Sequence, residues 1–139
     1  MPPVIFCDYQ NTLDQPNSEI LLDTLQEMKD NGAIIYMATN ENGKEAKFYS
    51  DVLKEKGYDL FDSIISLNTF KYTKSMTRYW PAVQNKLGLN LEDIILLDDD
   101  PDNLGLAKRY GVNAISSIPS AKAAEELKAT YQKLSNRPT

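Results

Sequence analysis

The sequence predicts an α/β domain of three-layer, Rossmann-like architecture, in which helices flank a central, mostly parallel, five-stranded sheet. Short apolar runs alternate along the chain with segments whose apolar residues recur at helical spacing. The length of 139 residues suits one core that needs no disulfide or metal to hold it together. We therefore expect a single domain over residues 1–139, with a frayed tail at 135–139.

The five expected strands are short apolar runs bounded by turn-forming residues. Each is too short for a helix, and a helical pattern separates it from the next, which favours parallel crossover connections. The expected strands cover residues 4–7, 33–38, 63–67, 94–97 and 112–115.

The first expected helix begins after a cap at Asn17 or Ser18 and ends at Gly32. The second covers residues 43–56, and we expect its inward face to carry Phe48, Val52 and Leu53. Along the first helix, apolar residues and one threonine repeat at helical spacing: Ile20, Leu21, Thr24, Leu25 and Met28.

Three further helices complete the pattern. The third covers about residues 76–87, where Pro81 must lie in the first turn or kink the helix. The fourth covers about 102–110 and the fifth about 121–134. Only 10–17 and 39–42 are irregular near the carboxyl edge of the predicted sheet, so we expect a crevice open to bulky ligands.

Composition excludes several kinds of chemistry. The chain contains no histidine, which excludes Ser-His and Cys-His nucleophile pairs and His-ligated zinc. Cys7 is the only cysteine, and its place on an apolar strand favours core packing. The net charge of -5 disfavours nucleic acid as a partner. No apolar run is long enough for a membrane span or a signal peptide, so we expect a cytoplasmic protein.

Two acidic strand ends stand out. Asp8 follows the first strand, and a run from Asp98 to Asp102 follows the fourth. The carboxyl ends of parallel strands meet at the crevice where open α/β sheets bind ligands. Close carboxylates repel one another, and a hard cation with oxygen ligands relieves that repulsion. This pattern points to Mg²⁺, although a solvated turn and helix cap would explain the second acidic run equally well.

In order, these motifs resemble the haloacid dehalogenase-like (HAD) superfamily of phosphatases and phosphotransferases, over nearly the whole chain. The family's first motif, Asp-x-Asp-x-Thr after an apolar strand, resembles Asp8-Tyr9-Gln10-Asn11-Thr12 except at its second Asp. Its second motif, a Ser or Thr that ends the next strand, resembles Thr39-Asn40.

The third family motif is a lysine before a helix, and Lys71 or Lys74 can fill it. The interval from Lys74 to Leu87-Gly88-Leu89 and on to Asp99 resembles the family's spacing, which favours Lys74. The fourth motif is an acidic cluster after a later strand, which the run from Asp98 resembles.

The resemblance implies a role for each residue. Asp8 would attack phosphorus and form an aspartyl-phosphate. Thr39, Asn40 and Lys74 would bind the phosphoryl group. The remaining roles concern the metal and its surroundings: Mg²⁺ would be held by Asp8, the Gln10 backbone carbonyl and Asp99, with Asp98, Asn103 and Thr12 supporting this arrangement.

The glutamine at position 10 departs from the family. The second Asp of the family protonates the leaving group and later activates water, and the amide of Gln10 can do neither. Three interpretations stay open: a slow or narrowly specific Mg²⁺-dependent phosphatase or phosphotransferase, a catalytically impaired module that binds a phosphorylated ligand or partner protein, and an engineered or trapping substitution. We expect the enzyme.

The segments after Asp8 and Thr39 are too short for a cap, so the chain resembles the capless members. Such relatives often act on macromolecules or borrow a lid from a second subunit. With the negative net charge, this resemblance implies a phosphoprotein or small phosphoester substrate. The sequence leaves the oligomeric state open.

Overall fold

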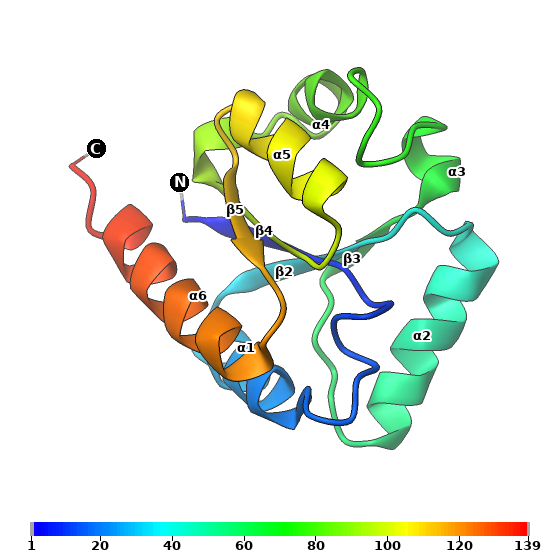
Figure 1. Ribbon diagram of the computed structural model, residues 1–139, viewed down its shortest axis with the longest axis vertical. Coiled ribbons are helices and arrows are strands. Elements are labelled where there is room, and N and C mark those ends of the chain that lie inside the picture. Colours follow the sequence, from blue (N-terminus) through cyan, green and yellow to red (C-terminus); the bar gives the residue numbers. More distant parts are fainter. Residues whose placement is uncertain (1, 139) are drawn as a thin grey trace.

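A computed structural model describes residues 2–138 of the chain. Its five strands form one sheet in the order β3-β2-β1-β4-β5, and every neighbouring pair is parallel. The predicted α/β class is therefore confirmed (Figure 1). The strands are β1 (Val4–Cys7), β2 (Ile34–Ala38), β3 (Ser63–Ile65), β4 (Ile94–Asp98) and β5 (Asn113–Ser116).

Helices cover both faces of the sheet (Figure 1). One face is covered by α1 (Glu19–Asp30), α2 (Gly43–Glu55) and α6 (Ser120–Ser135). The other is covered by α3 (Leu67–Phe70), α4 (Tyr79–Leu87) and α5 (Pro101–Arg109), and a 3-10 turn, η1 (Leu91–Asp93), precedes β4.

The central strand β1 divides the core in two. Successive strand side chains point to opposite faces, so Ile5 and Cys7 belong to one buried cluster and Val4 and Phe6 to the other. All four are buried, which is typical of a parallel strand covered on both sides. Cys7 is thus a core residue, as the sequence predicts.

Helix α2 has a different rotation from the one expected. Phe48 was predicted to face inward, but its side chain is 60% exposed, so that prediction is wrong. The buried stripe contains Ala46, Tyr49, Ser50 and Leu53. These positions follow the i, i+3, i+4, i+7 pattern of one helix face, and Phe48 lies off it. An aromatic neighbour pair, Phe48-Tyr49, cannot place both rings on that face.

The third strand and third predicted helix also differ from expectation. Strand β3 ends at Ile65, because Ser66 forms a capping box with Thr69 and begins the short helix α3. Helix α4 begins at Tyr79, and Pro81 lies in its first turn, where proline is tolerated. Within residues 2–138, no helix is both long enough and apolar enough to span a membrane.

The start of α2 offers a stability test. The Asn42 side chain accepts a hydrogen bond from the backbone N–H of Glu45, 2.9 Å away. This bond satisfies one of the free N–H groups of the first turn. We expect Asn42→Ala to lower the free energy of unfolding by about 1 kcal/mol. Urea unfolding checks this; Asn42→Ser should retain most of the stability, and equal loss in both variants would contradict the capping role.

Candidate active site

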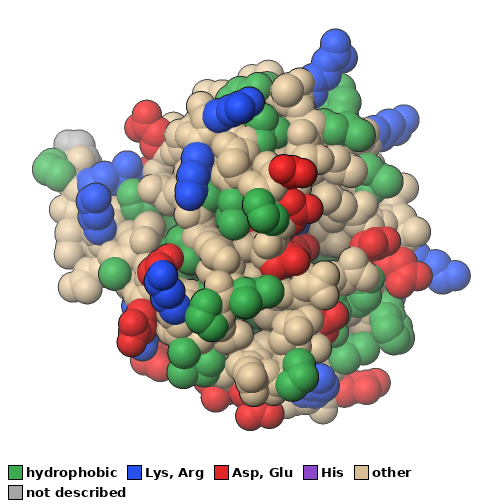
Figure 2. Space-filling model, in the orientation of Figure 1, with side chains coloured by type: hydrophobic (Ala, Val, Ile, Leu, Met, Phe, Trp, Pro, Cys, Tyr) green, Lys and Arg blue, Asp and Glu red, His purple; other side chains and the backbone are tan. Residues whose placement is uncertain are grey.

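The loops after β1, β2 and β4 meet at the carboxyl edge of the sheet around a hollow of about 150 Å³. In Figure 2, acidic side chains gather near the middle of the visible face, below helix α5. The hollow brings together all the predicted site residues except Thr12. Its lining consists of Asp8, Gln10, Asn11, Thr39, Asn40, Lys74, Asp98, Asp99, Asp100 and Asn103.

The nucleophile candidate is held by the strand beside it. The backbone N–H of Asp8 donates to the carbonyl of Leu97 at 2.9 Å, which continues the β1–β4 ladder by one bond. The chain then turns sharply at Asn11, whose φ of 57° is in the left-handed region. The Asn11 N–H donates to the Asp14 carboxylate at 2.7 Å. This turn keeps Asp8 and Gln10 at the edge of the same hollow.

Lys74 is the buried cation of the site. Its Nζ lies 3.1 Å from Asp8 Oδ1 and 2.6 Å from Asp98 Oδ2, and it donates to the Ala38 carbonyl at 2.5 Å. Its side chain is 1% exposed. Lys71, the other sequence candidate, is exposed, forms the left-handed end of α3 and does not line the hollow. Of the two lysines, the structure places Lys74 against the carboxylates.

A polar side chain from the loop after β2 fixes the loop that carries Lys74. Asn40 Oδ1 accepts a hydrogen bond from the Lys74 backbone N–H at 2.8 Å. Thr39 is 3% exposed, and its Oγ1 accepts from the Glu41 backbone N–H at 3.1 Å. That bond leaves the hydroxyl hydrogen of Thr39 free to donate to a bound anion.

The acidic run after β4 divides into different roles. Asp98 is fully buried; its Oδ1 accepts from the Asp100 backbone N–H at 3.0 Å, and Asn103 Nδ2 donates to its Oδ2 at 3.2 Å. Asp100 caps α5, and Pro101 occupies the first turn. The helix-cap interpretation is therefore correct for Asp100, which also lines the hollow beside Asp98 and Asp99.

The site concentrates negative charge. Oxygen atoms of Asp8, Asp98 and Asp99 all lie within 4.8 Å of one another. The pKa of Asp8 is raised to about 7: burial raises it most, the Lys74 charge opposes that rise, and the Asp98 charge adds to it. Burial likewise raises the pKa of Asp99. One lysine does not neutralise three carboxylates, so the protein alone leaves an excess of negative charge.

Lys74 remains a cation in this setting. Burial alone would lower the pKa of its ammonium, but the charges of Asp8 and Asp98 outweigh burial and raise that pKa above its usual value. The ammonium is therefore a fixed positive charge beside Asp8.

The residues present fit a divalent cation. Mg²⁺ prefers carboxylate oxygens and water as ligands, and the three clustered carboxylates supply carboxylate oxygens. The buried Oδ1 of Asn103 has no hydrogen-bond partner within the described part of the chain. A buried amide oxygen without a donor is costly, and metal-bound water would satisfy it. Asp99 and Asp8 are the freer carboxylates, because Asp98 is already engaged by Lys74, Asn103 and Asp100.

Sequence reasoning missed Ser117 and Tyr49. Thr12 Oγ1 lies 2.8 Å from Ser117 Oγ and donates to Asp8 Oδ2 at a long 3.4 Å. Both hydroxyls are buried, so they fix the loop behind Asp8. A polar residue directly after the last strand was the available signal for Ser117. Tyr49 gave no such signal, because no local spacing links this position of α2 to Gln10, 39 residues away.

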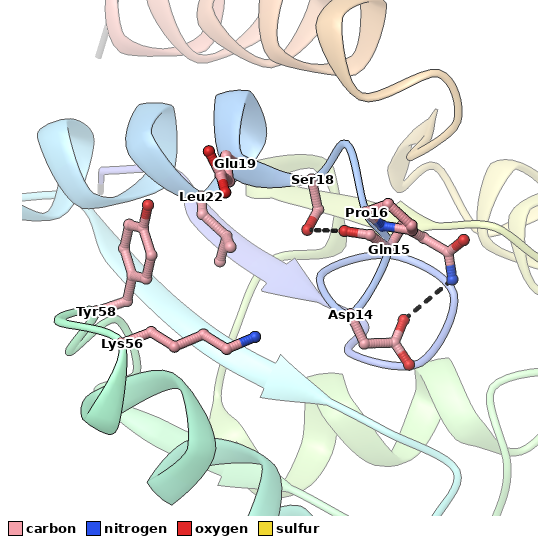
Figure 3. A pocket seen from close by; sticks show the side chains of 8 residues that line it. All are labelled: Asp14, Gln15, Pro16, Ser18, Glu19, Leu22, Lys56 and Tyr58. Carbon is pink, nitrogen blue, oxygen red and sulfur yellow. Dashed lines mark hydrogen bonds between the residues drawn. The ribbon is translucent and has the colours of Figure 1, made fainter.

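A larger hollow, of about 610 Å³, lies beside the loop after β1 (Figure 3). Ser18 and Gln15 flank one side of it, and Lys56 and Tyr58 the other. The Ser18 hydroxyl donates to the Gln15 carbonyl at 2.7 Å, an ordinary loop contact. The lining of this larger hollow includes neither Lys74 nor any of the three clustered carboxylates. The smaller hollow is therefore the candidate active site.

The chain is similar to known proteins in structure but not in sequence. No protein-family model matches the chain, and no curated protein is significantly similar in sequence. Among solved structures, an uncharacterized protein from Corynebacterium glutamicum matches with a TM-score of 0.77 and 19% identity, over 95% of this chain and 96% of that one. A predicted phosphoglycolate phosphatase from Haemophilus somnus 129PT matches with a TM-score of 0.60 and 20% identity, over 88% of this chain and 61% of that one.

A HAD-family enzyme from Bacteroides thetaiotaomicron, solved with magnesium and inorganic phosphate, matches with a TM-score of 0.55 and 19% identity. The match covers 68% of this chain and 48% of that one. At these identities the likeness concerns the fold. The chain therefore shares its α/β fold with these three proteins.

Proposed function

We propose that this protein is a capless, Mg²⁺-dependent HAD-type phosphatase or phosphotransferase that acts through an aspartyl-phosphate on Asp8. The observation that carries the proposal is the buried ammonium of Lys74, held 3.1 Å from Asp8 and 2.6 Å from Asp98 at the carboxyl edge of the sheet. A carboxylate, a fixed cation and a free hydroxyl converge there, as phosphoryl transfer requires. The fold shared with HAD-family phosphatases supports the same function.

The chain's own residues divide the work. The Asp8 carboxylate attacks phosphorus, and the bond from phosphorus to the leaving oxygen breaks. Lys74 stabilises the negative charge on the phosphoryl oxygens, and the Thr39 hydroxyl donates to one of them. Asp98 pairs with Lys74 and accepts a hydrogen bond from Asn103, and neither Asp98 nor Asn103 reacts.

Asp8, Asp99 and the Gln10 backbone carbonyl would hold Mg²⁺, which supplies charge neutralisation at the phosphoryl group when bound. Gln10 cannot protonate the leaving group, because a carboxamide has no proton to exchange near neutral pH. General acid-base catalysis contributes about 10²- to 10⁴-fold in rate. We therefore propose slow turnover or a narrow preference for substrates with good leaving groups.

The substrate class follows from the shape and charge of the site. The segments after β1 and β2, at 8–18 and 39–42, contain no inserted domain that would cover the hollow. A small, uncovered hollow suits a phosphoryl group presented on a protein or a small phosphoester. The net charge of -5 disfavours nucleic acid, and we place the enzyme in the cytoplasm.

A second candidate function is a catalytically impaired module that binds a phosphorylated ligand or partner protein. Gln10 is the observation that favours it, because phosphate and metal binding need no proton transfer. This module would bind phosphorylated ligands through Asp8, Thr39 and Lys74 without turnover.

Asp8→Asn tests the enzyme directly. We expect it to abolish Mg²⁺-dependent phosphate release from a panel of phosphoesters and phosphopeptides, because an amide is a poor nucleophile. Asp51→Asn, at an exposed position of α2 outside the hollow, is the matched control and should retain release. Release that persists unchanged in Asp8→Asn would contradict catalysis at this site.

Magnesium should stabilise the fold. Relief of repulsion among the three carboxylates favours the folded state, and a ligand at 100 times its Kd contributes about 2.7 kcal/mol. We expect a rise in the melting temperature with Mg²⁺ that Asp99→Asn reduces. A melting temperature indifferent to Mg²⁺ over a wide concentration range would count against the metal site, for the enzyme and the binding module alike.

A further inference from the structure

The Gln10 side chain has one described protein partner. Its Nε2 donates a hydrogen bond to the Tyr49 hydroxyl at 2.8 Å. The two residues are 39 positions apart, so the contact joins the loop after β1 to helix α2. Gln10 also lines the hollow that contains Asp8 and Lys74. A core tyrosine therefore touches the residue that replaces the family's acid-base group.

Packing fixes the position of that hydroxyl. The ring of Tyr49 stacks on the ring of Tyr9, with centroids 4.3 Å apart and an angle of 13° between the planes. Tyr49 is 9% exposed and Tyr9 is 6% exposed. Tyr9 lies between Asp8 and Gln10 in the chain, so the stack ties the site loop to α2. The hydroxyl is a rigid anchor for the carboxamide of Gln10.

The anchor distinguishes the two ends of the carboxamide. Its nitrogen is occupied by Tyr49, whereas its oxygen has no hydrogen bond to any residue in 2–138. The free end is thus an acceptor, which can hold a water molecule but cannot donate to a phosphoryl oxygen. Loss of the anchor would let the amide rotate and present its N–H groups to the anion instead.

We propose that Tyr49 is a positioning residue, which holds Gln10 with its carbonyl oxygen free to orient the water that hydrolyses phospho-Asp8. This inference rests on the proposed function. In that step the water oxygen bonds to phosphorus, the bond from phosphorus to Asp8 breaks with its electron pair on the carboxylate, and a phosphoryl oxygen takes the water's proton. Gln10 takes none. Tyr49 thereby favours hydrolysis over a long-lived phospho-Asp8.

Tyr49→Phe tests the proposal, because it keeps the stacked ring and removes the hydroxyl. We expect the hydrolysis of phospho-Asp8 to slow by roughly 3- to 10-fold, the range that one hydrogen bond contributes. The decay of labelled phosphoprotein in a single turnover measures this rate. KM should not change. In the Gln10→Ala background, Tyr49→Phe should have no further effect. Tyr58→Phe is the matched control, because it removes a tyrosine hydroxyl that donates to Asp23 instead. Its phospho-Asp8 should decay at the wild-type rate.

A second readout does not depend on turnover. In ¹⁵N-labelled protein, the side-chain amide of Gln10, assigned with Gln10→Ala, should give two dispersed proton resonances. These should move to the positions of a solvated glutamine in Tyr49→Phe but not in Tyr58→Phe.

An amide spectrum unchanged by Tyr49→Phe would overturn the proposal, as would equal slowing with and without Gln10. A protein that forms no phospho-Asp8 with any phosphodonor would refute the proposed function, and with it the hydrolytic part of this inference. The amide spectrum would still show whether the Tyr49 hydroxyl contacts the Gln10 side chain.

Discussion

Gln10→Asp should raise the turnover of the protein about 10²- to 10⁴-fold, the usual contribution of general acid-base catalysis. The substitution supplies the one group that the site lacks. Asp8, Thr39, Lys74 and Asp99 already line the hollow. The gain should be largest for substrates whose leaving groups need a proton, such as alkyl phosphates, and smallest for aryl phosphates, which leave readily as anions. Steady-state phosphate release on both classes measures it.

Gln10→Asn is the matched control, because it shortens the side chain equally without adding a carboxyl group. It should give no gain. A variant Gln10→Asp that binds Mg²⁺ but stays as slow as the wild type on alkyl phosphates would contradict the account, since the missing proton donor would not then limit the rate.

Lys74→Met should have the largest effect on stability. It removes the buried ammonium and leaves the carboxylates of Asp8 and Asp98 without their cation. Loss of one partner from a buried ion pair costs about 3–5 kcal/mol. We expect that loss in the free energy of unfolding, measured by urea in the absence of metal, together with loss of phosphate release.

Magnesium should recover part of the stability of Lys74→Met but not the release, because the metal replaces charge without replacing the contact to the phosphoryl group. Lys71→Met is the control. Lys71 is exposed and outside the hollow, so its replacement should change stability by less than about 0.5 kcal/mol and leave release intact. Equal effects of the two substitutions would refute the assignment of Lys74.

The fold was largely predictable from the sequence, because strong apolar periodicity shows in what succession strands and helices follow one another along the chain. Gly32 and Gly88 mark helix ends where the structure has φ of 99° and 66°, values that favour glycine. Rotation of a helix about its axis was less predictable. Phe48 and Tyr49 are both aromatic, and only packing against the sheet decides which one is buried.

The site was predictable where a polar residue ends a strand. Asp8, Thr39 and Asp98 are examples, because strand ends in a parallel sheet converge. Contacts made across elements were not predictable. The bond from Gln10 to Tyr49 joins a loop to a helix 39 positions away, and no local spacing encodes it. The choice of Lys74 over Lys71 followed from a family resemblance, and the structure supplies the physical reason in the buried carboxylates around it.

The most direct test of the central claim is mass spectrometry of the protein after brief exposure to a small phosphodonor, with and without Mg²⁺, followed by peptide mapping. We expect one added phosphoryl group, on Asp8, that requires Mg²⁺, is absent from Asp8→Asn and disappears more slowly in Tyr49→Phe. Phosphate release without any adduct, or an adduct that forms on another residue of Asp8→Asn at the wild-type rate, would contradict it.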